Sequence, residues 1–344
     1  MGVGFSMISL KNKIYLKFFL LIILLSIGVL LTIGWFYLNT PLLKKGNDSS
    51  NLVIERGTTL GQVASKLKRQ GLLENSFPLV LVVRLQGAER NLVAGEYLVT
   101  SRDTILSLVR KITTGKVVQH PFTIIEGWTF QKIRTALENN SQINNLLGGL
   151  TDDELMKKIG HEGEHPEGIF APDTYFFNDQ TSDVTILKMA YDLMSKRLSN
   201  AWDNRKGRLP YRCEYEALIV ASLIEKETAD ETDKFLVASV IVNRLNRGML
   251  LQVDPAVIYG LADSYKGILT KSELMKNTPY NTYLYKGLPP TPICMPGAKS
   301  IEAALNPEAS NYLFYVSRKD GTHEFSSNLT EQNRAVKKYL LNRL

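Results

Sequence analysis

The sequence predicts an α+β protein, with one apolar helix near the N-terminus, a small module after it, and a larger mixed α+β region. Three observations predict this: an uncharged stretch from Phe18 to Leu38, short apolar segments that alternate with amphipathic ones, and a buried helical run that leads into two glutamates. About 300 residues follow the uncharged stretch, which is enough for two domains with their own cores. The expected divisions are a tail at 1–17, a span at 18–38, a linker at 39–50, a module at 51–118 and the larger region at 119–344.

The uncharged stretch, FFLLIILLSIGVLLTIGWFYL, is long enough to cross a membrane. At about 1.5 Å per residue, such a helix spans a hydrocarbon core of roughly 30 Å. Lys11, Lys13 and Lys17 precede it, which favours a cytoplasmic N-terminus. A cleaved signal peptide is the alternative, but residues 37–40 offer no small-x-small cleavage site. We expect an uncleaved single-pass anchor in the inner (plasma) membrane, with the rest of the chain extracytoplasmic, in the periplasm.

The module at 51–118 has the pattern of a strand, two helices, a second strand and a last helix. The elements are expected at 52–55, 60–67, 78–85, 95–99 and 104–112. The strand-helix-helix-strand order, with Gly-Thr-Thr-Leu at its first turn, resembles LysM modules, which bind glycans that contain N-acetylglucosamine. A spacer that holds the larger region away from the membrane is the alternative.

One segment of the module is echoed 70 residues later in the chain. IERGTTLGQVASKL at 54–67 is similar to IIEGWTFQKIRTAL at 124–137. Each copy places a glycine and a hydroxyl residue where a strand would turn into a helix, and a hydroxyl residue there can cap the helix. We expect one strand-turn-helix unit that is used twice, rather than a repeat array.

Two glutamates at the end of an apolar helix suggest acid–base chemistry. The run Ala217–Ile224 precedes Glu225 and Glu227. A carboxyl group beside apolar surface is poorly solvated, so its pKa rises toward the value that a general acid needs. At about 100° per residue, Glu227 falls on the apolar face and Glu225 roughly opposite. Glu227 is therefore the candidate acid; the alternative is that both lie on the solvated end of a core helix.

Three loops contain residues suited to binding a sugar chain. The loop at 160–177 holds an aromatic cluster (Phe170, Tyr175, Phe176 and Phe177) that could stack on sugar rings or pack in the core. In LQVDPAVIYG, Gln252 and Asp254 precede a helix that starts near Pro255, with Asp254 expected as its N-cap. The loop at 277–297 has five prolines, so it is stiff, and it presents rings, hydroxyls and amides. Its candidate substrate-binding residues are Tyr280, Asn281, Thr282 and Tyr283; the alternative is an ordered connector.

Composition argues against several other classes of function. The net charge of +7 is mild, and the sequence has no run of basic and aromatic residues that would suggest nucleic-acid binding. The histidines and cysteines have no metal-site spacing, so no metal or other cofactor is expected. Cys213 and Cys294 could pair outside the cytosol, but sequence alone leaves this open.

Several short segments follow one another in a specific order: EGIFAPDTY at 167–175, ASLIEKETA at 221–229, LQVDPAVIYG at 251–260, GLPPTPICMPG at 287–297 and HEFSSN at 323–328. Together with the apolar N-terminal helix and the small module, this set resembles the YceG-like family of endolytic murein transglycosylases. The resemblance implies a lyase that cleaves MurNAc–GlcNAc β-1,4 bonds in nascent peptidoglycan strands and leaves 1,6-anhydro-MurNAc ends. It also implies that no cofactor is used.

The resemblance further implies a single-carboxylate mechanism, in which Glu227 acts first as general acid and then as base. Gln252, Tyr280 and Asn281 would position the sugars, and peptidoglycan synthases of the elongation or division machinery would be partners. Two rival functions remain open. A hydrolytic muramidase would use a second carboxylate, for which Asp254 is available. A non-catalytic glycan-binding scaffold would rely on the LysM-like module.

Overall fold

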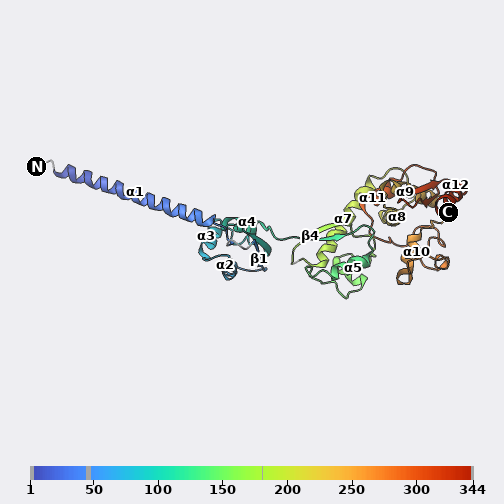
Figure 1. Cartoon of the computed structure of the whole chain (residues 1–344), viewed down its shortest axis with the longest axis horizontal. Coiled ribbons are helices and arrows are strands. Elements are labelled where there is room, and N and C mark those ends of the chain that lie inside the picture. The colour runs from blue at the N-terminus through green and yellow to red at the C-terminus, as the bar shows by residue number, and fades with distance from the viewer. Residues whose placement is uncertain (1–3, 44–47, 180, 342–344) are drawn as a thin grey trace. The chain divides into compact units, whose positions relative to one another are not determined.

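The computed structural model describes residues 4–43, 48–179 and 181–341, and the chain divides into two compact units, with the boundary between Gln119 and His120 (Figure 1). The sequence-based division falls one residue earlier. The first unit begins with helix α1 (Gly4–Leu38), in which Tyr15–Leu38 has a mean hydropathy of 2.7 and is long enough to cross a membrane. The predicted span, which begins at Phe18, lies within this segment.

The remainder of the first unit has the predicted order of elements: β1 (Ser49–Ile54), α2 (Leu60–Arg69), α3 (Phe77–Leu85), β2 (Gly95–Thr100) and α4 (Ile105–Thr114). β1 pairs antiparallel with β2. Of the expected linker, residues 44–47 lie outside the described residues, while Leu42 and Leu43 are buried in the core of this unit. The Leu42 amide also donates to the Asp103 carbonyl oxygen at 2.8 Å, which joins the end of α1 to the module.

The second unit is mainly helical, with two small antiparallel sheets, β3–β4 and β5–β6. Its elements are β3 (His120–Ile124), α5 (Phe130–Glu138), α6 (Asp152–Ile159), β4 (Asp173–Phe177), α7 (Asp183–Asp203), α8 (Glu214–Glu227), α9 (Glu231–Asn246), α10 (Asp254–Leu261), α11 (Ala298–Leu305), β5 (Phe314–Ser317), β6 (His323–Ser326) and α12 (Leu329–Val336). Short 3-10 turns at Ala262–Ser264 and Glu273–Met275 follow α10, and a π-helical turn at Lys337–Leu341 follows α12.

Helix α8 lies at the centre of the second unit, where α7, α9, α10 and α11 all pack against it (Figure 1). Every residue from Ala217 to Ile224 is buried. The apolar face on which the sequence analysis placed Glu227 therefore does not by itself distinguish Glu227 from Glu225, because side chains all around this stretch are buried. What separates Glu225 from Glu227 must be their individual partners.

The predicted strand-turn-helix unit occurs twice, once in each unit of the chain. Gly57 and Gly127 have φ of +81° and +75°, which is the left-handed region that glycine tolerates best. The next helix is capped in both copies: Thr59 accepts from the Gln62 amide, and Thr129 accepts from the Lys132 amide. Local sequence therefore specifies the same turn in two different surroundings.

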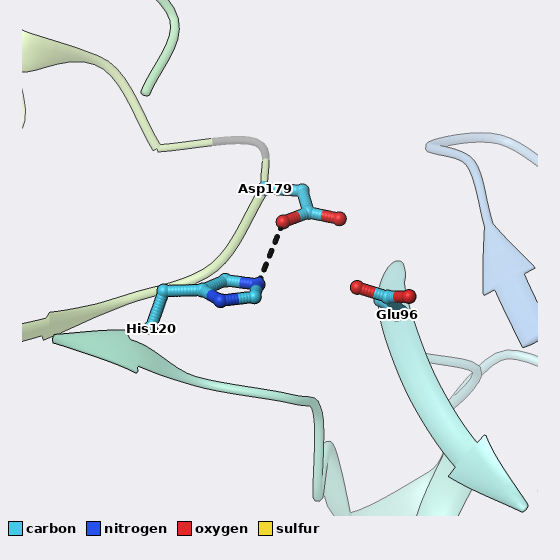
Figure 2. A group of neighbouring side chains, drawn as sticks. All are labelled: Glu96, His120 and Asp179. Atoms are coloured by element: carbon cyan, nitrogen blue, oxygen red, sulfur yellow. Dashed lines mark ion pairs between the residues drawn. The ribbon is translucent and has the colours of Figure 1, made fainter. Parts of the chain in front are cut away.

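The aromatic loop before α7 serves mainly as core. Phe170, Tyr175 and Phe177 are buried, whereas Phe176 is exposed. The two cysteines are free, with Cys213 at the surface and Cys294 buried. His120, at the start of β3, places Nε2 2.9 Å from Oδ1 of Asp179 (Figure 2). His323 pairs through Nδ1 with Oδ2 of Asp233 at 3.0 Å, so both imidazoles have carboxylate partners.

Candidate active site

Glu225, near the end of α8, is tied into the protein structure. Its carboxylate accepts hydrogen bonds from the Lys234 ammonium at 3.2 Å, the Gly297 amide at 3.0 Å and the Ser300 hydroxyl at 2.5 Å. The side chains of Glu225 and Lys234 are only 8% and 5% exposed. Gly297 and Ser300 form the N-terminus of α11, where the helix dipole favours a negative charge. Glu225 thus joins α8 to α9 and α11.

Glu227, two residues later, has a different environment. Its half-buried carboxyl group shares a hydrogen bond with the Tyr315 hydroxyl of β5. Burial and, to a smaller extent, the nearby Asp254 charge raise the pKa of Glu227 to about 7, against the opposing effects of the Tyr315 hydrogen bond and the Arg244 charge. A carboxyl group with this pKa exists in both protonation states near neutral pH. It can therefore donate a proton and later accept one.

Arg244 of α9 holds two segments of the site together. Its buried guanidinium donates to the carbonyl oxygens of Leu313 at 2.6 Å and Leu251 at 2.8 Å, and to Oε1 of Gln252 at 3.3 Å. The first contact fixes the chain just before β5, and the other two fix the chain just before α10. Arg244 thereby brings the elements that carry Tyr315 and Asp254 to the end of α8.

Gln252, just before α10, and Asp254, the first residue of α10, are both exposed at the surface. Gln252 has φ of +51°, a backbone state that non-glycine residues rarely adopt. Its amide donates to the Thr282 carbonyl oxygen at 3.1 Å, which helps to hold that conformation. Such strain often accompanies functional sites.

The expectation that Asp254 caps α10 is wrong. Val253 occupies the cap position, and no side chain caps the helix there. Asp254 is already helical, so its carboxylate is free to accept a hydrogen bond from the Tyr283 hydroxyl at 2.5 Å. Burial and this contact raise the pKa of the Tyr283 phenol.

Asn281 and Thr282 have buried side chains that bond mainly to the backbone. The Asn281 amide group donates to the carbonyl oxygens of Leu274 and Lys276, and its oxygen accepts from the Tyr283 amide at 2.9 Å. The Thr282 hydroxyl accepts from the Val253 amide at 2.9 Å. Both residues therefore fix the loop that presents Tyr283 to Asp254.

Tyr280 instead lines a groove of about 990 Å³. Its ring meets that of Tyr259 edge-on, with centroids 4.8 Å apart, and Trp128 contributes a third aromatic side chain. Polar side chains also line the groove: Thr129, Gln131, Lys132, Thr135, Asn139 and Glu167. Tyr259 and Asp254 both belong to α10, separated by a rise of roughly 8 Å. The groove therefore lies close to the Glu227 cluster.

Glu167 lies at the inner side of this groove and is almost completely buried. Its carboxylate accepts from the Phe130 amide and the Tyr259 hydroxyl, both at 3.0 Å. Burial raises the pKa of Glu167 to about 7, although both hydrogen bonds act in the opposite direction. Glu167 supports Tyr259 and satisfies the N-terminus of α5.

Sequence reasoning did not select Arg244, Tyr315 or Glu167. Arg244 gave one usable signal, because it is the single charged residue in the helical stretch SVIVNRL. Glu167 lies in a loop with other acids, and Tyr315 lies in a short strand with other aromatic residues, so neither differs from its neighbours.

The chain matches a known class of proteins over most of its length. A family model described as the YceG-like family matches residues 52–338, and the chain belongs to that family.

Individual proteins that are similar to this chain agree with this family assignment. A Bacillus subtilis protein named endolytic murein transglycosylase is 30% identical over 320 residues, which cover 87% of each chain. A Streptococcus pneumoniae protein of the same name is 24% identical, over 96% of this chain and 66% of its own length. The crystal structure of a YceG-like protein from Listeria monocytogenes has a TM-score of 0.51 and 26% identity, and covers 84% of this chain and 99% of its own.

Proposed function

We propose that this protein is a peptidoglycan lytic transglycosylase. It would cleave the β-1,4 bond between MurNAc and GlcNAc within a glycan strand and leave a 1,6-anhydro-MurNAc end. The observation that carries the proposal is the environment of Glu227, whose pKa of about 7 suits a carboxyl group that must give up and regain a proton. Membership of the YceG-like family and the names of two relatives support it.

Glu227 would act twice. Protonated Glu227 donates to the glycosidic oxygen while positive charge develops at the MurNAc anomeric carbon. The resulting carboxylate then removes the proton from the C6 hydroxyl of the same sugar, and that oxygen attacks the anomeric carbon to close the anhydro ring. The bond to the leaving GlcNAc breaks, a C1–O6 bond forms, and Glu227 ends the cycle protonated. No water is consumed.

The neighbours of Glu227 would have separate tasks. Asp254 and Tyr283 stabilise positive charge on the sugar, and the exposed Gln252 side chain binds a sugar substituent. Tyr315 and Arg244 are positioning residues, since each acts on Glu227 or on the backbone around it. Asn281 and Thr282 act on the substrate only through the loop that they hold.

The groove beside α10 would bind the glycan strand on one side of the scissile bond. Trp128, Tyr259 and Tyr280 offer aromatic faces, on which the apolar faces of sugar rings can stack. Gln131 and Asn139 offer amides for hydroxyl and N-acetyl groups. This division assigns Tyr280 to strand binding and Tyr283 to the reacting sugar.

Helix α1 would anchor the protein in the plasma membrane, with both compact units on the extracytoplasmic side, as the lysines before the span favour. The small module, with its order β1-α2-α3-β2, would act as a LysM-like glycan-binding subdomain. Peptidoglycan synthases of the elongation or division machinery would be its partners in the membrane.

Product analysis tests the proposal. The full-length protein in detergent and its Glu227→Gln variant would each be incubated with purified peptidoglycan, and the ends of the products identified by mass spectrometry. We expect anhydro-MurNAc ends from the unchanged protein only. Reducing ends would instead show a muramidase, a possibility that the charge of Asp254 near Glu227 keeps open. Glycan binding with no cleavage by either protein would support a scaffold.

A further inference from the structure

Helix α3 exposes a stripe of large apolar side chains. Phe77, Leu81 and Leu85 recur every four residues, so they lie on one face of the helix. They are 64%, 41% and 79% exposed, respectively, whereas Leu79, Val82 and Val83 on the other face are buried in the core of the first unit. A soluble helix of this kind would normally present charge to water, and α3 contains only one charged residue, Arg84.

The stripe adjoins the C-terminal part of α1, beside which α3 lies in Figure 1. A groove of about 620 Å³ between the two helices is lined on one side by Phe77, Leu81 and Leu85. On the other side it is lined by the α1 residues Leu30, Ile33, Gly34, Tyr37 and Leu38. These α1 residues cover a rise of roughly 12 Å at the end of a span that needs roughly 30 Å to cross the hydrocarbon core.

Exposed aromatic residues mark the same level along α1. Trp35 and Phe36 are exposed, and Tyr37 is partly so. Such residues gather where the acyl chains meet the headgroups. The junction is also held firmly, because the Leu42 amide donates to the Asp103 carbonyl oxygen and Leu38 packs on the core of the first unit. A bilayer that surrounds α1 up to these aromatic residues therefore meets the stripe on α3.

We propose that α3 is a membrane-interface helix, with Phe77, Leu81 and Leu85 inserted among the lipid acyl chains of the outer leaflet beside α1. This inference rests on the proposed membrane span of α1. The occupant of the groove is lipid, because one of its walls is the face of a helix that already lies in lipid. An interfacial helix buries its apolar face roughly 5–10 Å into the headgroup and acyl boundary.

The polar groups of α3 suit this position. Asn75 accepts a hydrogen bond from the Phe77 amide at 3.0 Å, and Pro78 has no amide hydrogen to satisfy at the first turn. The helix therefore begins with few unpaired donors. Arg84 pairs with Glu89 at 2.7 Å, and its long side chain can extend toward the headgroups. Inserting the stripe therefore leaves the one charge of α3 outside the hydrocarbon, and Glu74, which also lines the groove, would lie at the level of the headgroups.

The test measures the depth of three labels in the full-length protein. Each variant has a single added cysteine in a Cys213→Ser background, carries an environment-sensitive fluorophore, and is reconstituted into vesicles with acyl-brominated phosphatidylcholine. Leu85→Cys reports the stripe, and Leu24→Cys reports the span. Arg56→Cys, exposed in the turn after β1, is the matched control in the same unit. Each position is exposed, so substitution should leave the fold intact.

We expect bromolipid to quench the labels at Leu24 and Leu85, each at least about twofold more than the label at Arg56. Quenching at Leu24 but not at Leu85 would overturn the interface helix and leave the anchor standing, as when a protein partner covers the stripe. Equal quenching at Leu85 and Arg56 would also overturn it. Absence of quenching at Leu24 would overturn the anchor itself, and the interface helix with it.

Discussion

The two sides of the C-terminal end of α8 differ more than their sequence suggests. Glu225 accepts hydrogen bonds from donors of α9 and α11, whereas Glu227 lies beside Tyr315, Arg244 and Asp254 and its pKa is raised mainly by burial. One intervening residue separates them. A carboxylate that accepts three hydrogen bonds from the protein has a structural role. A carboxyl group whose pKa is raised to about 7 can instead transfer a proton in a reaction.

The largest expected effect is on catalysis, and it should separate the two glutamates. Glu227→Gln removes the only group that is proposed to transfer the proton, so the rate of cleavage should fall by roughly 10²–10⁴-fold. Glu225→Gln should leave the rate per folded molecule within about tenfold of the parent, since it alters support rather than chemistry. Release of muropeptides from peptidoglycan measures both. Equal losses in two folded variants would remove the distinction.

The second effect is on stability, and here Glu225→Gln should have the larger effect of the two variants. Glu225→Gln leaves the buried Lys234 ammonium without its counter-charge, which should cost about 3 kcal/mol in the free energy of unfolding. For a unit of this size, the melting temperature should fall by roughly 10 °C. Calorimetry is the measurement. The double variant Glu225→Gln, Lys234→Met should recover part of the loss, and failure to recover any would place the cost elsewhere.

The third effect is the pH dependence. Since Glu227 must be protonated to act as acid, kcat/KM should fall as pH rises above about 7. The free energy of unfolding should also fall as pH rises. The folded state holds the Glu227 proton more tightly than the unfolded chain does, so stability should decline as pH rises from about 4.5 to about 7.

The control for this pH dependence is Glu227→Gln, which should show a smaller decline in melting temperature over the same range. Some decline should remain, because the pKa of Glu167 is also raised to about 7. A kcat/KM that stays level from pH 6 to pH 9, measured at roughly one-unit steps, would contradict the assignment of Glu227 as the acid.

The smallest expected effects are opposite shifts of one pH profile. Tyr315→Phe removes a hydrogen bond that lowers the pKa of Glu227, so the alkaline limb should move to higher pH. Asp254→Asn removes a charge that raises this pKa, so the limb should move to lower pH. Rates measured between about pH 5 and 9 would reveal shifts of several tenths of a unit. Shifts in the same direction would show that the variants act through the fold instead.

Much of the fold was predictable because its signals are local. Thr59, Thr129 and the glycines before them specify turns within a few residues, and the apolar periodicity of the first unit indicated its elements. The different environments of Glu225 and Glu227 at the end of α8 were only partly predictable. Helical periodicity separated Glu225 from Glu227, but it could not show that the helix before them is buried on all sides.

The remainder of the site depends on contacts between distant segments. Arg244 finds its partner Leu313 69 residues away, and Glu167 finds Tyr259 92 residues away. No local pattern encodes these distances. The incorrect prediction that Asp254 caps α10 has the same origin. An aspartate near the start of a helix has the sequence pattern of an N-cap, and only the structure shows that its carboxylate instead accepts from Tyr283.

The joint between α1 and the first module has a consequence for how the protein would meet its substrate. Leu42 is buried and bonded to Asp103, so the module cannot rotate freely about the end of the anchor. If α1 spans the membrane as proposed, the first unit diffuses in a plane, and the second unit can act only within the reach of the chain that joins it to the first. The effective concentration of the enzyme is therefore high for glycan strands close to the membrane surface. It falls to nearly zero for strands that lie beyond this reach. Nascent glycan strands would then be selected by their distance from the membrane, without a binding pocket that distinguishes nascent from mature strands.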